Sequence, residues 1–124
     1  MISGFLLVNK DSGISSSRVV QILKKKFNLK KVGHLGTLDP MATGLLIIAI
    51  NRATKFASLL LQSEKSYRAE VTLGTQTDTD DAEGAVISTK KNFKNKSEVK
   101  EALLTFLGES EQLPPNYSAL KHKG

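Results

Sequence analysis

One stretch in the first half of the chain, residues 33–46, constrains the fold more than any other. It reads GHLGTLDPMATGLL, and three glycines divide it. Pro40 biases Asp39 towards an extended backbone and cannot continue a helix, while the glycines permit sharp reversals. The apolar run LLIIAI then occupies residues 45–50 and predicts a fully buried strand. We therefore expect a stiff loop that carries a carboxylate and leads into a central strand.

Asp39 admits two interpretations. Asp-Pro pairs commonly begin turns, so the pattern by itself favours a turn residue without a chemical role. Catalytic groups, however, are often placed on loops that a rigid scaffold holds. A carboxylate directly before a buried strand fits that second description as well.

The same stretch resembles the signature loop of the TruB family of tRNA pseudouridine synthases. That loop runs Gly-His-x-Gly-x-Leu-Asp-Pro-x-Ala-Thr-Gly, and every fixed position is present in residues 33–44. The resemblance implies that Asp39 is the catalytic nucleophile of an isomerase that converts a uridine in the T loop of tRNA to pseudouridine. The reaction detaches a base, turns it and rejoins it through carbon, and covalent attack by a carboxylate divides it into easier steps. Such chemistry needs neither a metal nor a cofactor.

Three further residues match TruB positions, and the resemblance makes them candidate substrate-binding residues. Lys10, in LLVNKDSGISS, belongs to the family's first motif, with a structural or phosphate-contacting role. His34 matches the histidine that inserts beside the extruded nucleotide. Tyr67, in KSYRAEVTLG, matches the tyrosine that stacks on the target base. Simpler alternatives are a loop histidine bonded to backbone for His34 and a core position for Tyr67.

The remaining pattern predicts an α+β fold with a mixed, mainly antiparallel sheet flanked by helices, which by the resemblance is an incomplete pseudouridine synthase fold. Strands are expected at residues 5–8, 45–50, 67–73 and 85–88, and helices from Ser15 or Ser16 to about Phe27, at 52–61, and from Ser97 to Leu107. The acidic segment TQTDTDDAEG between the last two strands is expected to be a loop. At least one strand edge should be unpaired, which favours self-association.

Charge favours a polyanionic partner. The net charge is +6 at pH 7, with a pI near 9.6. Arg18, three consecutive lysines at 24–26, Lys30 and Lys31 occur with no acidic residue between positions 12 and 31. They form either a solvated helix face or a surface that contacts RNA.

Other classes of protein find no support in the sequence. Without cysteine there is neither a disulfide framework nor a cysteine-ligated zinc site, which agrees with a cytoplasmic protein. The N-terminus lacks a basic leader, and no apolar run approaches the roughly 18 residues of a membrane span. Residues 78–81 begin like a calcium loop, but Ala82 and Glu83 then break the pattern and leave a solvated acidic turn. We expect no metal, no cofactor and no membrane contact.

The extent of the resemblance limits what these 124 residues can do. TruB chains are more than twice as long, so residues 1–124 are expected to be the N-terminal part of the catalytic domain, without its C-terminal half and the PUA domain. The arginine that pairs with the catalytic aspartate has no counterpart, and PPNYSALKHKG at 114–124 resembles only the start of an RNA clamp. We therefore expect these residues alone to be inactive. The expected partner is the T-arm stem-loop of tRNA, bound by a monomeric full-length protein. The alternative is a non-catalytic RNA-binding or tRNA-folding module.

Overall fold

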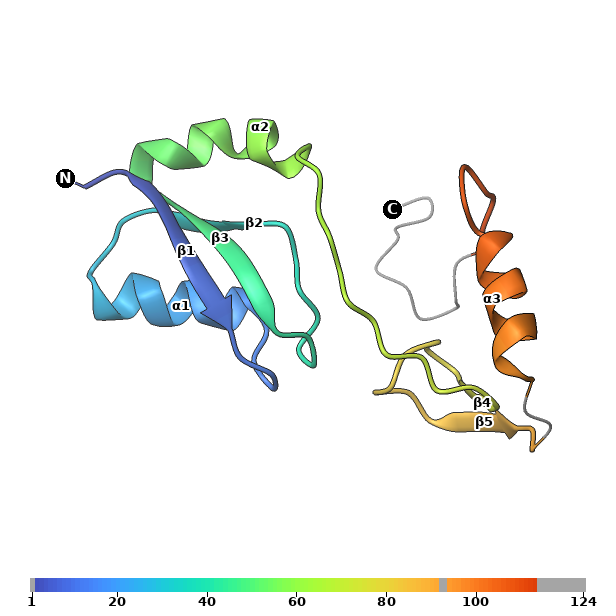
Figure 1. Cartoon of the computed structure of the whole chain (residues 1–124). Coiled ribbons are helices and arrows are strands. Elements are labelled where there is room, and N and C mark those ends of the chain that lie inside the picture. The colour runs from blue at the N-terminus through green and yellow to red at the C-terminus, as the bar shows by residue number, and fades with distance from the viewer. Residues whose placement is uncertain (1, 92–93, 114–124) are drawn as a thin grey trace. The chain divides into compact units, whose positions relative to one another are not determined.

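The structure, a computed structural model, describes residues 2–91 and 94–113 (Figure 1). The chain divides into two compact units, residues 1–67 and 68–124. Within the described ranges, no helix combines the length and the apolar character needed to cross a membrane. The expected clamp segment at 114–124 lies outside the described residues.

A three-stranded antiparallel sheet forms the centre of the first unit. Its order is β1 (Gly4–Lys10), β3 (Gly44–Ile50) and β2 (Val32–Leu35), so β3 pairs on both sides. Along β1 and β3 the register runs from Gly4 opposite Ile50 to Lys10 opposite Gly44. The sheet is part of an α+β unit, as the sequence predicts, and its described pairs are all antiparallel.

The central strand confirms the main prediction for this unit, with one correction. Leu46 and Ile48 of β3 are 1% and 0% exposed, but Leu45 is 62% exposed, so the strand is not buried throughout. Strand β2 was not predicted, because three of its four residues lie in the stretch that the glycine pattern indicates as a loop. Pairing with β3 supplies a partner that the local pattern does not reveal.

Helices cover the two faces of this sheet. Helix α1 (Ser16–Lys26) packs on one face, and the 3₁₀ helix η1 (Asn51–Phe56) with α2 (Ala57–Leu61) packs on the other (Figure 1). On the α1 face the core is Val19, Leu46 and Ile48, joined by half-buried neighbours. On the α2 face it is Leu35, Ala49 and Ala53. Burial on both faces makes β3 the structural centre of the unit.

Helix α1 begins and ends close to the predicted positions. The Ser15 hydroxyl accepts a hydrogen bond from the Arg18 N–H and caps the helix, which confirms one of the two predicted caps. The helical spacing of Val19, Ile22, Leu23 and Phe27 predicts a single apolar face, and this prediction is wrong at two positions, because Ile22 and Phe27 are 43% and 56% exposed. Phe27 lies at the C-cap, where the chain leaves the helix and no longer follows its apolar face.

The helix predicted at residues 52–61 is divided. It begins as the 3₁₀ helix and only then becomes α-helical. The Thr54 hydroxyl donates to the Asn51 carbonyl at 2.8 Å, and so competes for an acceptor that a regular α-helix would pair with an amide.

The second unit contains a two-stranded hairpin and one helix. The hairpin pairs β4 (Thr75–Thr77) with β5 (Val86–Thr89), and the helix is α3 (Lys96–Leu104). β5 confirms the strand predicted at 85–88 within one residue, but β4 lies where a loop was predicted. The strand predicted at 67–73 is wrong for the described structure, since this extended segment has no ladder partner there. No described residue of this unit is buried.

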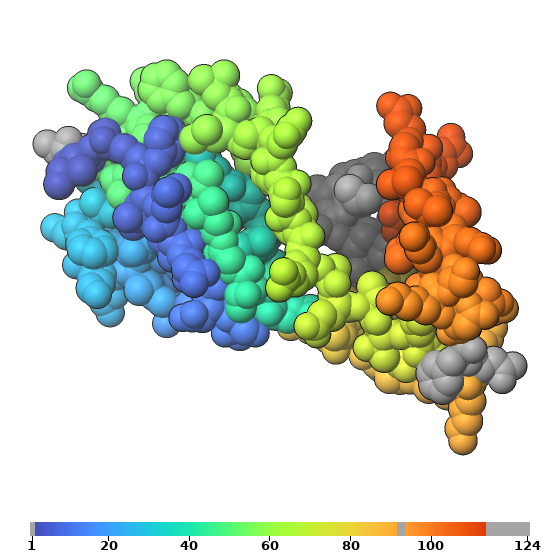
Figure 2. Space-filling view, viewed as in Figure 1, coloured from blue at the N-terminus to red at the C-terminus, as the bar shows by residue number. Residues whose placement is uncertain are grey.

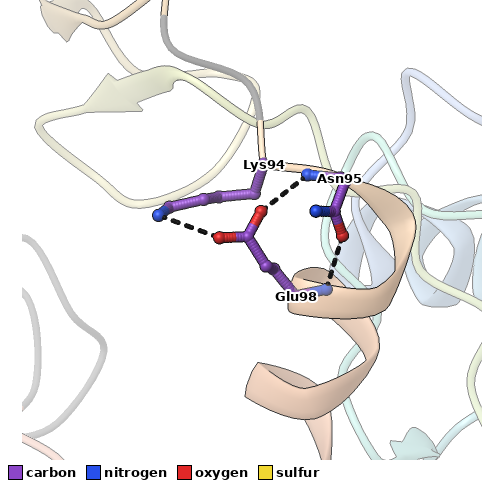
Figure 3. A network of polar contacts seen from close by, with 3 residues as sticks. All are labelled: Lys94, Asn95 and Glu98. Carbon is purple, nitrogen blue, oxygen red and sulfur yellow. Dashed lines mark hydrogen bonds and ion pairs between the residues drawn. The ribbon is translucent and has the colours of Figure 1, made fainter.

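Helix α3 begins with a capping box rather than with the predicted Ser97 cap (Figure 3). The Asn95 side chain accepts from the Glu98 N–H at 3.0 Å, and the Glu98 carboxylate accepts from the Asn95 N–H at 3.0 Å. Lys94 Nζ lies 3.3 Å from the same carboxylate. The reciprocal bonds satisfy two amides and fix the start of the helix. The helix ends at Leu104, three residues before the predicted end.

Candidate active-site loop

The connection between β2 and β3, residues 36–43, carries Asp39 and is held by a distant segment of the chain. On the N-terminal side of Asp39, the Ser16 hydroxyl donates to the Leu38 carbonyl and accepts from the Leu38 N–H, both at 3.0 Å. Ser16 is 2% exposed and is the first residue of α1. The start of the helix therefore fixes the backbone directly before Asp39.

The backbone directly after Asp39 is held by the segment that follows β1. The Pro40 carbonyl accepts from the Gly13 N–H at 2.8 Å and from Lys10 Nζ at 3.1 Å. The Ser12 hydroxyl donates to the Met41 carbonyl at 3.0 Å. Residues on both sides of Asp39 are thus hydrogen-bonded to residues 10–16.

Lys10 is a buried ammonium group with a complete set of acceptors. It is 1% exposed. Its Nζ donates to the carbonyls of Asp11 at 2.9 Å, Ile14 at 2.7 Å and Pro40 at 3.1 Å. An ammonium group has three protons, so these carbonyls use all of them and replace the water lost on burial. The geometry favours the structural alternative for Lys10 and gives no support to a contact with substrate phosphate.

Asp39 lies in a turn, as one of the two interpretations expects, and its catalytic role stays a prediction. Its carbonyl accepts from the Ala42 N–H at 3.0 Å, which makes it a turn residue. The residue is nevertheless exposed. The one ion pair found among the described residues joins Lys94 to Glu98, so no described cation pairs with Asp39. The result is a carboxylate on a fixed backbone, open to a ligand.

His34 lies on β2, five residues before Asp39, and is half-buried. Its Nδ1 is 2.8 Å from the Gly36 carbonyl. Because a carbonyl can only accept, Nδ1 carries the proton, and Nε2 of the neutral ring is an acceptor. The hydrogen bond from the histidine ring to the backbone, which the simpler interpretation expects, is present, although His34 lies on a strand and not in a loop. It orients the ring and leaves Nε2 available to a ligand.

Tyr67 is the last residue of the first unit and is 73% exposed. A core position is therefore wrong for the described structure. No hydrogen bond joins Tyr67 to the Asp39 loop in the described ranges, so its stacking role stays a prediction. The chain just before it does approach the loop, since a Cβ built on Gly36 would lie 3.9 Å from Cε of Lys65.

Sequence reasoning missed the residues that hold the loop. No role in holding the loop was predicted for Ser12, Gly13 or Ser16, although the loop depends on them, and Ser16 was considered only as a possible helix cap. A serine at the first position of a helix was the available signal, but serines there usually serve their own helix.

The described residues contain no group of three or more His, Cys, Asp or Glu side chains that could hold a metal ion. The acidic turn is internally hydrogen-bonded instead. The Thr79 hydroxyl and, to a smaller extent, the Glu83 N–H bond the Asp81 carboxylate and lower its pKa below the ordinary value of 3.8. This is the solvated acidic turn that the sequence predicts.

A solved structure defines the class of fold. The chain is similar to a protein in the crystal structure of a Cbf5-Nop10-Gar1 complex, with a TM-score of 0.64 and 26% identity, over 95% of this chain and 31% of that one. The described helices and antiparallel strands are accordingly an incomplete α+β pseudouridine synthase fold.

The chain belongs to the TruB family, because the family model described as TruB family pseudouridylate synthase (N terminal domain) matches residues 24–124. Two relatives, both described as tRNA pseudouridine synthase B, come from Alkaliphilus oremlandii and Blochmanniella floridana. They are 47% and 50% identical over 99% of this chain. The chain spans 41% and 48% of their lengths, so it corresponds to less than half of either relative.

Proposed function

We propose that this chain carries the catalytic aspartate of a tRNA pseudouridine synthase and that Asp39 is the nucleophile. Support comes from the family and from relatives described as tRNA pseudouridine synthase B. The observation that carries the proposal is the Asp39 loop itself. Residues 38, 40 and 41 are fixed by side chains and backbone from residues 10–16, while Asp39 is exposed. A fixed backbone beneath an exposed carboxylate favours reaction because less orientation is needed in the transition state.

The proposed reaction is an isomerisation. The bond between the ribose C1′ and the uracil N1 breaks, and a bond between C1′ and C5 forms. The hydrogen on C5 leaves as a proton, N1 gains a proton, and no electrons are exchanged with a cofactor. Asp39 attacks covalently during this exchange and is released at its end.

The target base must leave its loop to be reached, as with other enzymes that act on bases. Tyr67 is proposed as the stacking surface for that base, worth about 1–3 kcal/mol, which its 73% exposure permits. His34 is proposed to contact the extruded nucleotide through Nε2, because Nδ1 is already used by Gly36. The preferred substrate is the T-arm stem-loop, and the full-length protein is proposed to act as a monomer in the cytoplasm.

A chimera tests the proposal. This chain replaces the aligned part of the A. oremlandii relative, which supplies the rest of that protein. We expect tritium release from a T-arm stem-loop that contains 5-tritiated uridine. Asp39→Asn keeps the shape of the side chain but removes the nucleophile, and should reduce the rate at least about a thousandfold while RNA binding is retained. Asp80→Asn, at an exposed position in the second unit, is the matched control and should leave the rate unchanged.

Substantial turnover by Asp39→Asn would remove the nucleophilic role. A folded chimera that binds the stem-loop but never releases tritium, even with Asp39 present, would favour the alternative of a non-catalytic RNA-binding module. Primer extension after chemical labelling identifies the modified uridine. The 124 residues alone are expected to give no such signal.

A further inference from the structure

The C-terminal end of α1 carries a concentrated positive charge that the Asp39 loop does not use. We define the α1 lysine cluster as the exposed Lys24, Lys25, Lys26, Lys30 and Lys31. The first three form the last turn of the helix and the other two directly precede β2. This light-blue part of the chain is at the surface of the first unit in Figure 2.

The backbone at this end has a defined geometry. The Leu29 N–H donates to the Lys24 carbonyl at 3.0 Å, and the Asn28 N–H donates to the Lys25 carbonyl at 3.4 Å. Asn28 has a φ of 48°, in the left-handed region that asparagine tolerates. Together these form a Schellman motif, which ends the helix and reverses the chain. The lysines before and after the motif are therefore attached to an ordered turn.

The positive charge of the cluster is not neutralised locally. No acidic residue occurs between positions 12 and 31. The ion pair present in the described part of the chain, between Lys94 and Glu98, belongs to the second unit. Residues 1–67 contain ten Lys and Arg against three Asp and Glu, a net charge of +7, whereas residues 68–124 contain eight against nine, a net charge of −1. The basic character of the chain thus resides in the first unit.

An aromatic ring lies within the cluster. Phe27 is 56% exposed, although phenylalanine usually lies in the core. Lys26 Nζ is 5.8 Å from the centre of its ring, within the range of a cation–π contact. Exposed aromatic rings between cationic side chains are typical of surfaces that bind single-stranded nucleic acid, where bases stack and phosphates are neutralised.

The helix dipole gives a simpler account of part of this pattern. Lysines in the last turn of a helix stabilise it through a favourable interaction with its dipole. That account covers Lys24, Lys25 and Lys26, but Lys30 and Lys31 lie beyond the helix, and it gives no reason for an exposed Phe27. A polyanion with accessible bases accounts for all of these features.

We propose that the α1 lysine cluster and Phe27 form an RNA-binding surface, in which the lysines contact phosphates and Phe27 stacks on an unpaired base. The proposal rests on the proposed function in one respect, that the substrate is RNA. The lysines of the last turn of α1 lie eight to ten residues beyond Ser16, which holds the Asp39 loop, so they are separated from it by about 12–15 Å along the helix axis. The surface therefore contacts RNA at a distance from the target base and contributes affinity rather than chemistry.

The test measures binding by the full chain to a fluorescent T-arm stem-loop, by anisotropy from 50 to 300 mM salt. The triple variant Lys24→Gln, Lys25→Gln, Lys26→Gln should reduce the slope of log affinity against log salt by about 2–3, since each phosphate contact contributes about 0.7–0.9. Phe27→Ala should weaken binding about fivefold or more, and Phe27→Trp should retain it. Circular dichroism verifies that each variant is folded.

Two controls make the result specific. The matching triple Lys→Arg variant keeps the charge and should keep the slope. The triple Lys90→Gln, Lys91→Gln, Lys100→Gln removes the same charge from exposed positions of the second unit and should change the slope less. An equal change there would mean that net charge alone sets the affinity, and would overturn the proposal.

Two other outcomes would also overturn it. One is an unchanged slope in the α1 triple variant. The other is competition by polyglutamate as effective as that by RNA of equal charge, which would indicate an acidic protein partner. The proposed function fails differently, through turnover by Asp39→Asn in the chimera. There the α1 triple variant should raise KM and leave the single-turnover rate at saturating RNA unchanged.

Discussion

Helix α1 in the first unit and helix α3 in the second both begin with a side-chain cap, and both have an apolar face. They differ in whether other residues pack against that face. Val19 of α1 packs on Leu46 and Ile48 and is 8% exposed. Leu103 of α3 is 62% exposed, and no residue of α3 is buried. A helical pattern shows that a helix has an apolar face, but burial requires a second layer.

The units also differ in their polar groups. The first unit buries Lys10, Ser16 and Asn51, and each of them hydrogen-bonds backbone groups far away in the sequence. In the described part of the second unit the side-chain hydrogen bonds are local and exposed, as in the capping box of α3. Long-range bonds of buried groups fix tertiary structure, whereas local exposed bonds fix only the element that contains them.

The largest expected contrast comes from one leucine in each unit. Leu46→Ala should lower the free energy of unfolding by about 2–5 kcal/mol, because it leaves a cavity beneath α1. Leu103→Ala, at an exposed position of α3, should change it by less than about 0.5 kcal/mol. Urea unfolding followed by circular dichroism measures both. Similar losses from the two variants would show that α3 is packed as firmly as the sheet.

A pair of lysines gives the next contrast. Lys10→Met should cost about 1–3 kcal/mol, because buried carbonyls lose their donor. Lys94→Met removes an exposed ion pair and should cost about 0–1 kcal/mol. Amide exchange adds a local measurement, since Gly13 donates to Pro40 beside Lys10. Its exchange should accelerate only in Lys10→Met, and unchanged exchange there would show that Lys10 does not hold the Asp39 loop.

The smallest effect concerns pH and is confined to the second unit. Hydrogen bonds from Thr79 and Glu83 lower the pKa of Asp81, so they favour its ionised form. Their stabilisation is present above the ordinary pKa of 3.8 and is lost as pH falls through the lowered value. The amide shift of Glu83 should follow the protonation of Asp81 as pH falls below 3.8, while the amides of β3 stay constant. In Asp81→Asn this movement should disappear.

Predictions from the sequence were correct where the residues of a helix or strand by themselves indicate that element. The run at 45–50 predicted β3, and the serines at positions 15 and 16 predicted the start of α1 to within one residue. Prediction failed where structure depends on a partner. The four residues of β2 form a strand because they pair with β3. Residues 67–73 alternate between apolar and polar but form no strand, because no strand pairs with them in the described part of the chain.

The candidate site likewise contains residues that the sequence indicates and residues that only the structure reveals. Asp39 and its neighbours could be found from the pattern of glycines and proline and from the TruB resemblance. The ties from Ser12, Gly13 and Ser16 could not, because they join residues more than 20 positions apart. The substrate contacts that the TruB resemblance implies for His34 and Tyr67 stay predictions.

Buried Lys10 has one more consequence, which concerns how β1 finds its place on β3. Apolar residues occupy both faces of these strands, so a shift by two residues would still pair leucine, valine and isoleucine with one another, and hydrophobic burial alone specifies the alignment weakly. Lys10 does not tolerate such a shift. Moving it by two residues displaces its ammonium group by about 7 Å and breaks its bond to the Pro40 carbonyl, whereas the Asp11 and Ile14 carbonyls belong to the segment directly after β1 and move with it. The bond between Lys10 and Pro40 thus favours the observed alignment of β1 on β3.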